Sequence, residues 1–111
     1  MNLDNSARAP SPAPASPLTA TLAQMRVARS GIMAIYQKLD NNEIYNHSDL
    51  KEINEIYQDK VLPFYLQNKE FIESPDKFIK DKTSKEYQEV EVFSHNLNDV
   101  KNRIMAIYFN Q

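Results

Sequence analysis

VEVFSHNLNDVKNRIMAI, the segment of residues 90–107, decides the fold class of this chain. Its large apolar residues recur at alternating steps of three and four, the spacing that brings side chains onto one face of an α-helix. The same spacing fills the a and d positions of a heptad without a miss. We therefore predict a helix from about Ser84 to Phe109 that hides this stripe against other helices. The run is too short to separate a bundle helix from a true coiled coil. The stripe consists of Val90, Phe93, Leu97, Val100, Ile104 and Ile107.

A second apolar stripe occupies residues 18–39 and predicts another helix, which Ser16 or Thr19 can cap. Gly31, the only glycine of the chain, lies inside it, although glycine costs roughly 1 kcal/mol in a helix interior. We therefore expect a neighbouring helix to approach closely at Gly31. Arg29 interrupts the stripe, either as an edge residue with its charge in water or as the partner of a carboxylate. The stripe consists of Leu22, Met25, Ile32, Ile35, Tyr36 and Leu39.

The charge of this segment differs from that of the rest of the chain. It carries Arg26, Arg29 and Lys38 and has no acidic residue before Asp40, whereas the remainder is net acidic. We therefore expect ion pairs between this helix and its neighbours. The sequence IMAIY occurs here and again at residues 104–108. Coincidence, an old duplication and pseudo-symmetric packing are all open explanations for this short repeat.

Residues 48–73 predict a third helix with a proline inside it. It should begin at Ser48 or Asp49, because Asp49 and Glu52 have the spacing of a capping box with Asp49 as the cap. Pro63 removes one backbone donor and clashes with the carbonyl four residues before it, so we expect a kink or a break close to this proline. The apolar positions are Leu50, Ile53, Ile56, Tyr57, Val61, Phe64 and Tyr65.

Two further start signals follow this helix. Ser74-Pro75-Asp76 combines a cap, a proline and an acid, and predicts a short helix over about 75–82. Thr83 and Glu86 have capping-box spacing and should open the last helix.

The N-terminal residues 1–17, MNLDNSARAPSPAPASP, contain four prolines and few large apolar side chains. Such a segment buries too little surface to offset its ordering entropy, so we expect a disordered tail with some polyproline-II character. Pro14 to Pro17 also fits a PxxP ligand motif, and a plain linker is the alternative. The predicted fold is all-α: a three- to four-helix bundle over residues 18–111 behind a disordered N-terminal tail.

Composition excludes several classes of protein. The chain has no cysteine, which removes disulfides, thiolate catalysis and cysteine-based zinc sites. A single glycine argues against phosphate-binding loops, which need several. The formal net charge of −2 gives no reason to expect nucleic acid as a partner. No apolar run approaches a membrane span, and no signal peptide is evident, so we expect a cytoplasmic protein or one secreted by a route without a cleaved signal peptide.

No residue pattern indicates catalysis, a metal or a cofactor. His47 falls in a predicted loop, and His95 falls on the predicted solvent face of the last helix. Glu91 and His95 are four residues apart, which is not the Glu-x-x-His spacing of di-iron bundles. The clustered carboxylates, such as Glu52 and Glu89, are expected on solvated helix faces rather than across a cleft. We therefore expect a protein that is not an enzyme and has no cofactor or metal ligand.

Six apolar residues lie outside the predicted core-facing stripes, or at their edges, and are candidates for contact with a protein partner. Methionine and aromatic residues in exposed patches are typical of such sites, although a wide core face would also use them. In size and composition the chain is like small helical adaptors, chaperones and secreted subunits, such as those of bacterial secretion systems. We expect a protein–protein interaction module or self-association through helices, with a small-ligand or metal-binding helical sensor as the alternative. The candidates are Met33, Tyr36, Val92, Met105, Tyr108 and Phe109.

Overall fold

A computed structural model describes residues 17–41 and 46–109 of the chain. These residues form helices and turns and contain no strand, which confirms the predicted all-α class. The predicted tail lies outside the described residues, except for Pro17, which is the first residue of a helix. In chain order the elements are α2 (Pro17–Asn41), α3 (His47–Ile56), the π-helical turn η1 (Tyr57–Val61), α4 (Leu62–Gln67), α5 (Lys69–Glu73), the 3-10 turn η2 (Pro75–Lys77) and α6 (Lys85–Phe109).

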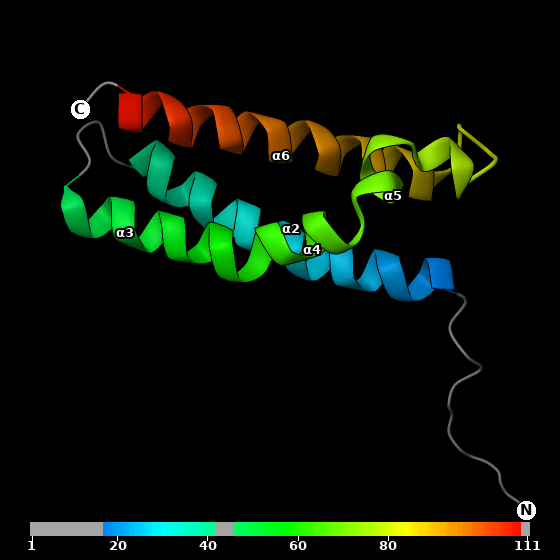
Figure 1. Cartoon of the computed structure of the whole chain (residues 1–111). Helices are drawn as coiled ribbons and strands as arrows, with labels where there is room; N and C mark the ends of the chain where they lie inside the picture. Colours follow the sequence, from blue (N-terminus) through cyan, green and yellow to red (C-terminus); the bar gives the residue numbers. More distant parts are fainter. Residues whose placement is uncertain (1–16, 42–45, 110–111) are drawn as a thin grey trace, which may run out of the picture.

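The described elements make a three-row helical bundle (Figure 1). α2 runs one way, residues 47–67 return as a single arm made of α3, η1 and α4, and α6 runs in the direction of α2. α2 contacts both the α3–α4 arm and α6, whereas no Cα of α3 lies within 8 Å of a Cα of α6. α2 is therefore the central row at the end of the bundle where α3 lies.

Three side-chain links fix how α2 and α6 lie alongside each other. Arg26 binds Glu89, Tyr36 binds Asp99, and Arg103 binds Asp40. Each link joins residues 63 positions apart in sequence, as expected for two parallel helices that keep one register. The two IMAIY segments are 72 positions apart, so they are not level with each other in this pairing. The packing of α2 on α6 therefore does not place the two IMAIY segments in equivalent positions.

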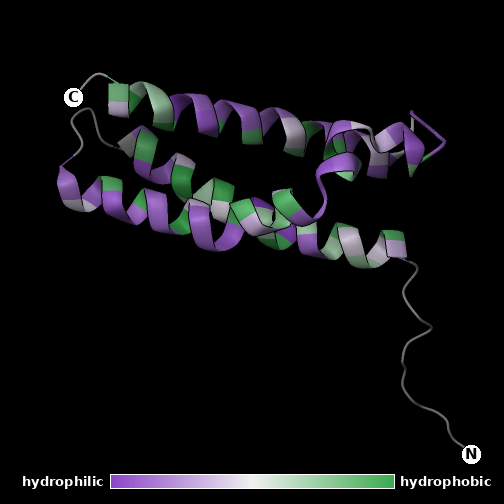
Figure 2. Ribbon diagram, viewed as in Figure 1, coloured by the Kyte–Doolittle hydropathy of each residue, from purple (hydrophilic) through white to green (hydrophobic). Residues whose placement is uncertain are grey.

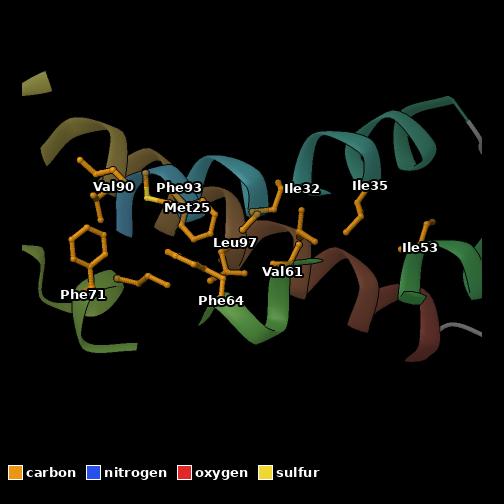
Figure 3. Close-up of a cluster of buried hydrophobic side chains, with 14 of the residues drawn as sticks. Met25, Ile32, Ile35, Ile53, Val61, Phe64, Phe71, Val90, Phe93 and Leu97 are labelled. Carbon is orange, nitrogen blue, oxygen red and sulfur yellow. The ribbon is translucent and has the colours of Figure 1, made fainter. Parts of the chain in front are cut away.

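The core fills the space between the three rows (Figure 3). Phe93 of α6 is fully buried, and its ring meets the ring of Phe64 edge-on, with 5.6 Å between centroids. Such edge-to-face pairs add to the stability gained from burial. The first four positions of the predicted α6 heptad are buried, whereas Ile104 and Ile107 are only partly covered. Full burial of the stripe thus ends before the helix does.

Pro63 neither breaks the arm nor leaves it a regular α-helix. The turn before it is π-helical, and the N–H of Leu62 donates to the carbonyl of Tyr57, five residues earlier. A π turn holds one residue more than an α turn, so the proline ring does not meet the carbonyl of Asp59 as it would in a regular helix. The helix then continues directly into α4.

The π turn lies against Gly31 of α2, which confirms the close approach predicted there. A Cβ added at Gly31 would lie 3.0 Å from the Cβ of Lys60 and 3.3 Å from Cγ2 of Val61. Both contacts are shorter than the van der Waals separation of about 3.5–4.0 Å between carbons. The single glycine therefore gives the widened turn room to pack on α2.

The start of α3 was predicted at the wrong cap. Its N-cap is Asn46, whose side chain accepts a 2.8 Å hydrogen bond from the N–H of Asp49. In return, the N–H of Asn46 donates to Oδ2 of Asp49, at 3.3 Å. Asp49 is thus the third residue of the capping box rather than its cap, and the helix begins at His47. An asparagine is as good a cap as an aspartate, so spacing alone did not separate the two.

The segment that joins α4 to α6 is also less helical than predicted. The helix expected to reach Glu73 is interrupted at Asn68, whose side-chain amide donates to the carbonyl of Phe64 at 3.0 Å. The short helix expected over 75–82 is only the three-residue turn η2, and the side chain of Ser74 makes no capping hydrogen bond. At the start of α6 the cap is Ser84 rather than Thr83, because Ser84 Oγ accepts from the N–H of Tyr87 at 3.1 Å.

Candidate interaction surface

Three of the six candidate residues gather in the last turns of α6. Met105, Tyr108 and Phe109 are 50%, 47% and 80% exposed. Their spacing of three and four residues places them on one side of the helix. Figure 2 shows this end of α6 in the green of apolar residues. We call these three residues the apolar end of α6.

The register of the bundle explains why the apolar end is exposed. α2 ends at Asn41, which the 63-residue offset places level with Ile104. The remaining residues of α6 therefore extend beyond the last residue of α2. α3, which lies on the other side of α2, does not approach α6. Neither helix row thus covers the apolar end.

Met33 and Val92 are exposed at another place, along the edge where α2 meets α6. Val92 borders a shallow hollow, together with Arg29 and Glu89. It precedes Met105 by 13 residues on α6, which is about 20 Å along a helix. The structure therefore does not bring all six candidates together, and this edge alternates apolar with charged groups.

Tyr36 has an internal role. Its hydroxyl donates a 2.6 Å hydrogen bond to Oδ2 of Asp99. The guanidinium of Arg103 lies 5.5 Å from the centre of its ring. Burial, followed by the hydrogen bond to Asp99, raises the pKa of Tyr36 to about 12. The polar end of Tyr36 thus ties α2 to α6, and only part of its ring faces solvent.

The charged residues of α2 pair with acidic residues on its neighbours, as the charge pattern predicted. Arg26 donates from two nitrogens to Glu89, at 2.7 and 2.8 Å, and Arg29 adds a longer contact of 3.8 Å to the same carboxylate. Hydrogen bonds from Arg26 hold the pKa of Glu89 below its ordinary value. Lys38 forms an ion pair with Glu52 of α3. Glu89 is therefore not on a solvated face, and Arg29 is an exposed edge residue that also meets a carboxylate.

A cavity of about 530 Å³ opens at the other end of the bundle, where α2 begins. Pro17, Leu18 and Thr21 of α2 form one wall. Phe71 of α5 and Phe78, which follows η2, stand in the lining, with their ring centroids 5.4 Å apart. Its volume falls within the range of ligand pockets in proteins. No local pattern in the sequence indicates this cavity, because its two sides come from segments about 50 residues apart.

The residues considered for metal or acid–base chemistry stand apart. His47 is the first residue of α3 and His95 lies on α6, both exposed. His95 borders a polar hollow with Glu91 and Asp76. Within the part of the chain that the structure describes, no three histidine or acidic side chains are placed to hold a metal ion. Within the same residues, no helix combines the length and apolar character that crossing a bilayer requires.

Sequence reasoning missed three exposed apolar residues. Val27 and Leu66 are 62% and 64% exposed on α2 and α4, and Phe78 is half-exposed at the cavity. Val27 and Leu66 could have been found, because both lie off the apolar stripes of their helices. Phe78 could not, since its neighbour Ile79 is buried and nothing in the sequence distinguishes the two.

The chain matches no protein-family model, no curated protein and no solved structure.

Proposed function

We propose that this protein is a non-enzymatic interaction module that binds a helix of another protein through the apolar end of α6. The observation that carries the proposal is the joint exposure of Met105, Tyr108 and Phe109 in the last turns of a helix. Exposed apolar groups that are contiguous, rather than scattered, are typical of binding surfaces. Methionine and aromatic residues are also enriched at the centres of protein interfaces.

The spacing of these residues fits the recognition of one helix by another. An amphipathic helix usually engages its partner through anchors at positions i, i+3, i+4 and i+7, and Met105, Tyr108 and Phe109 occupy the first three. Beside them, Ile104 and Ile107 continue the buried stripe and are only partly covered. A partner helix lying along this end would complete the burial that α2 provides farther back.

An adaptor, a chaperone or a secreted subunit would use such a surface in the same way. In each case the anchors stand on a helix that is already formed, so little conformational entropy is lost when the partner binds. The partner supplies an apolar stripe, either from another protein or from a second copy of this chain. Residence in the cytoplasm, or export by a route without a cleaved signal peptide, is compatible with this role.

The proposal is tested by capture of partners with two matched variants. The first replaces Met105, Tyr108 and Phe109 with serine. The control replaces Val27 and Leu66 with serine, because these residues are equally exposed on other helices. The natural chain and the control should retain the same partner, while the first variant should lose at least tenfold in affinity, as expected when interface anchors are removed.

Equal retention by both variants would overturn the proposal. Thermal melting of each variant shows that the substitutions leave the bundle folded, since exposed positions contribute little to stability. Light scattering of the natural chain across a range of concentrations identifies self-association, which the first variant should abolish and the control should not.

A further inference from the structure

A second stripe of residues runs along α6 beside the core stripe, and the bundle covers only one end of it. Its members recur at steps of four and three, the spacing that lines one face of a helix. α5 and η2 pack against the N-terminal half of α6 (Figure 1), and the polar hollow between them and α6 extends as far as Asn98. Beyond Asn98 the stripe is exposed at Met105 and Tyr108. The stripe consists of Tyr87, Glu91, Ser94, Asn98, Lys101, Met105 and Tyr108.

We propose that the open part of this face, residues 101–109, binds the same part of a second copy of this chain, with the two α6 helices antiparallel. The inference rests on the proposed function, because it names the partner of the apolar end of α6. In a two-fold symmetric pair of antiparallel helices, the contact is centred on a residue that meets its own copy. The middle residue of the open part is Met105, so Lys101 of one copy lies level with Phe109 of the other.

The charges of this segment favour an antiparallel pair of copies. The carbonyl end of a helix carries partial negative charge, which a nearby cation stabilises. The last turn of α6, residues 106–109, contains no basic residue, and antiparallel pairing brings Lys101 of the second copy to it. Phe109 offers an aromatic ring at the same place, which also attracts an ammonium group. A parallel pair would instead set the two negative helix ends side by side, and likewise the two Lys101 ammonium groups.

The position of Lys101 in the single chain is compatible with this contact. Its ammonium lies 5.6 Å from the centre of the Tyr65 ring, close to the limit of about 6 Å for such interactions. This weak contact is readily exchanged for one with the second copy. Each Lys101 stands four residues from the centre of the pair, so about 12 Å separates the two along the helix axes. This exceeds the Debye length of about 8 Å at physiological ionic strength, and their mutual repulsion is small.

The exposed area predicts a weak and reversible dimer. A large side chain buries about 150–250 Å² when it is fully covered, and Met105, Tyr108 and Phe109 are 50%, 47% and 80% exposed. Together these three side chains leave about 350 Å² exposed in each chain. With the groups around them, two copies bury on the order of 1,000 Å², which is the lower limit for a specific interface. We therefore expect monomers at about 10 µM and mostly dimers at about 1 mM.

Single-cysteine variants of the full chain test the geometry, because the natural chain contains no cysteine. Helices packed 8–10 Å apart bring facing Cα atoms to about 3.5–5.5 Å, which overlaps the range of about 4.4–6.8 Å in disulfides. Met105→Cys should therefore give a covalent dimer under mild oxidation. Val92→Cys is the control: it is 54% exposed on the same helix, but its two copies would stand about 39 Å apart. Met105→Cys should react about tenfold faster or more, because its thiols are held together. Equal rates would overturn the inference.

Sedimentation equilibrium of the natural chain tests the dimer without a substitution at its centre. The average mass should rise from one chain toward two between about 10 µM and 1 mM. Lys101→Glu sets an acid beside each negative helix end and should raise the dissociation constant of the dimer about tenfold. Lys80→Glu, an equal change of charge at an exposed position before α6, should leave it unchanged.

A mass that stays at one chain throughout this range would overturn the inference, as would an equal effect of Lys101→Glu and Lys80→Glu. The proposed function fails on a different result. If the apolar end of α6 captures another protein while the chain stays monomeric, the binding role stands and only the second copy is wrong.

Discussion

Replacing Gly31 with alanine sets two known effects against each other. Alanine is favoured over glycine in a helix interior by about 1 kcal/mol. Against this, the new Cβ would stand 3.0 Å from the Cβ of Lys60 and 3.3 Å from a methyl group of Val61. The nearest atom is a Cβ, which is fixed to the backbone of the π turn and cannot rotate away. Added methyl groups in tight packing cost about 1–3 kcal/mol, so the packing cost should prevail.

We therefore expect Gly31→Ala to lower the free energy of unfolding by about 1 kcal/mol. Gly31→Val should cost more, because it adds two further methyl groups at the same contact. Urea unfolding followed by far-ultraviolet circular dichroism measures both. Ser30→Ala is the control: Ser30 is exposed, immediately precedes Gly31, and its hydroxyl donates only to the carbonyl of Val27 in its own helix, so its replacement should change the free energy of unfolding by no more than a few tenths of a kcal/mol.

The opposite result is easily recognised. If Gly31→Ala stabilises the chain by about 1 kcal/mol, only helix propensity is acting at that position. The π turn would then not press on α2, and the account of why the arm tolerates Pro63 would be wrong.

Three further predictions concern the core, the ion pair and the hydroxyl of Tyr36. Phe93→Ala should cost about 3–5 kcal/mol in urea unfolding, whereas Phe109→Ala should stay within about 0.5 kcal/mol; similar losses would contradict the burial of Phe93. Since Arg26 lowers the pKa of Glu89, the ion pair stabilises the fold above about pH 4.3, and this stabilisation is lost as the pH falls. The melting temperatures of the natural chain and of Glu89→Gln should therefore converge in acid. A difference between the two melting temperatures that does not change with pH would refute this. Tyr36→Phe should remove from the ultraviolet titration the ionisation near pH 12, and the loss of an ionisation near pH 10, the ordinary value for tyrosine, would mean instead that the hydroxyl is exposed.

The helices could be predicted from the sequence because burial imposes the period that defines them. The stripe from Val90 to Val100 is buried as its spacing required. Cap positions were less certain, since Asn46 and Asp49 both suit a cap and only the folded backbone decides between them. The π turn before Pro63 was also beyond sequence reasoning, because its stability depends on the space beside Gly31, which belongs to another helix.

The candidate surface was predictable in part for a similar reason. Met105, Tyr108 and Phe109 lie off the apolar seam of their own helix, and the sequence alone shows this. The role of Tyr36 depends on the register between α2 and α6, which brings Asp99 to its hydroxyl. That register is a property of tertiary packing and leaves no trace in the local pattern.

Photo-crosslinking tests the binding role. A photo-reactive residue is placed in turn at positions 105, 108 and 109, and, as a control, at the exposed position of Glu86 at the start of α6. We expect a discrete adduct from the three C-terminal positions and none from position 86. An adduct of equal yield from all four positions, or none from positions 105, 108 and 109, would contradict it.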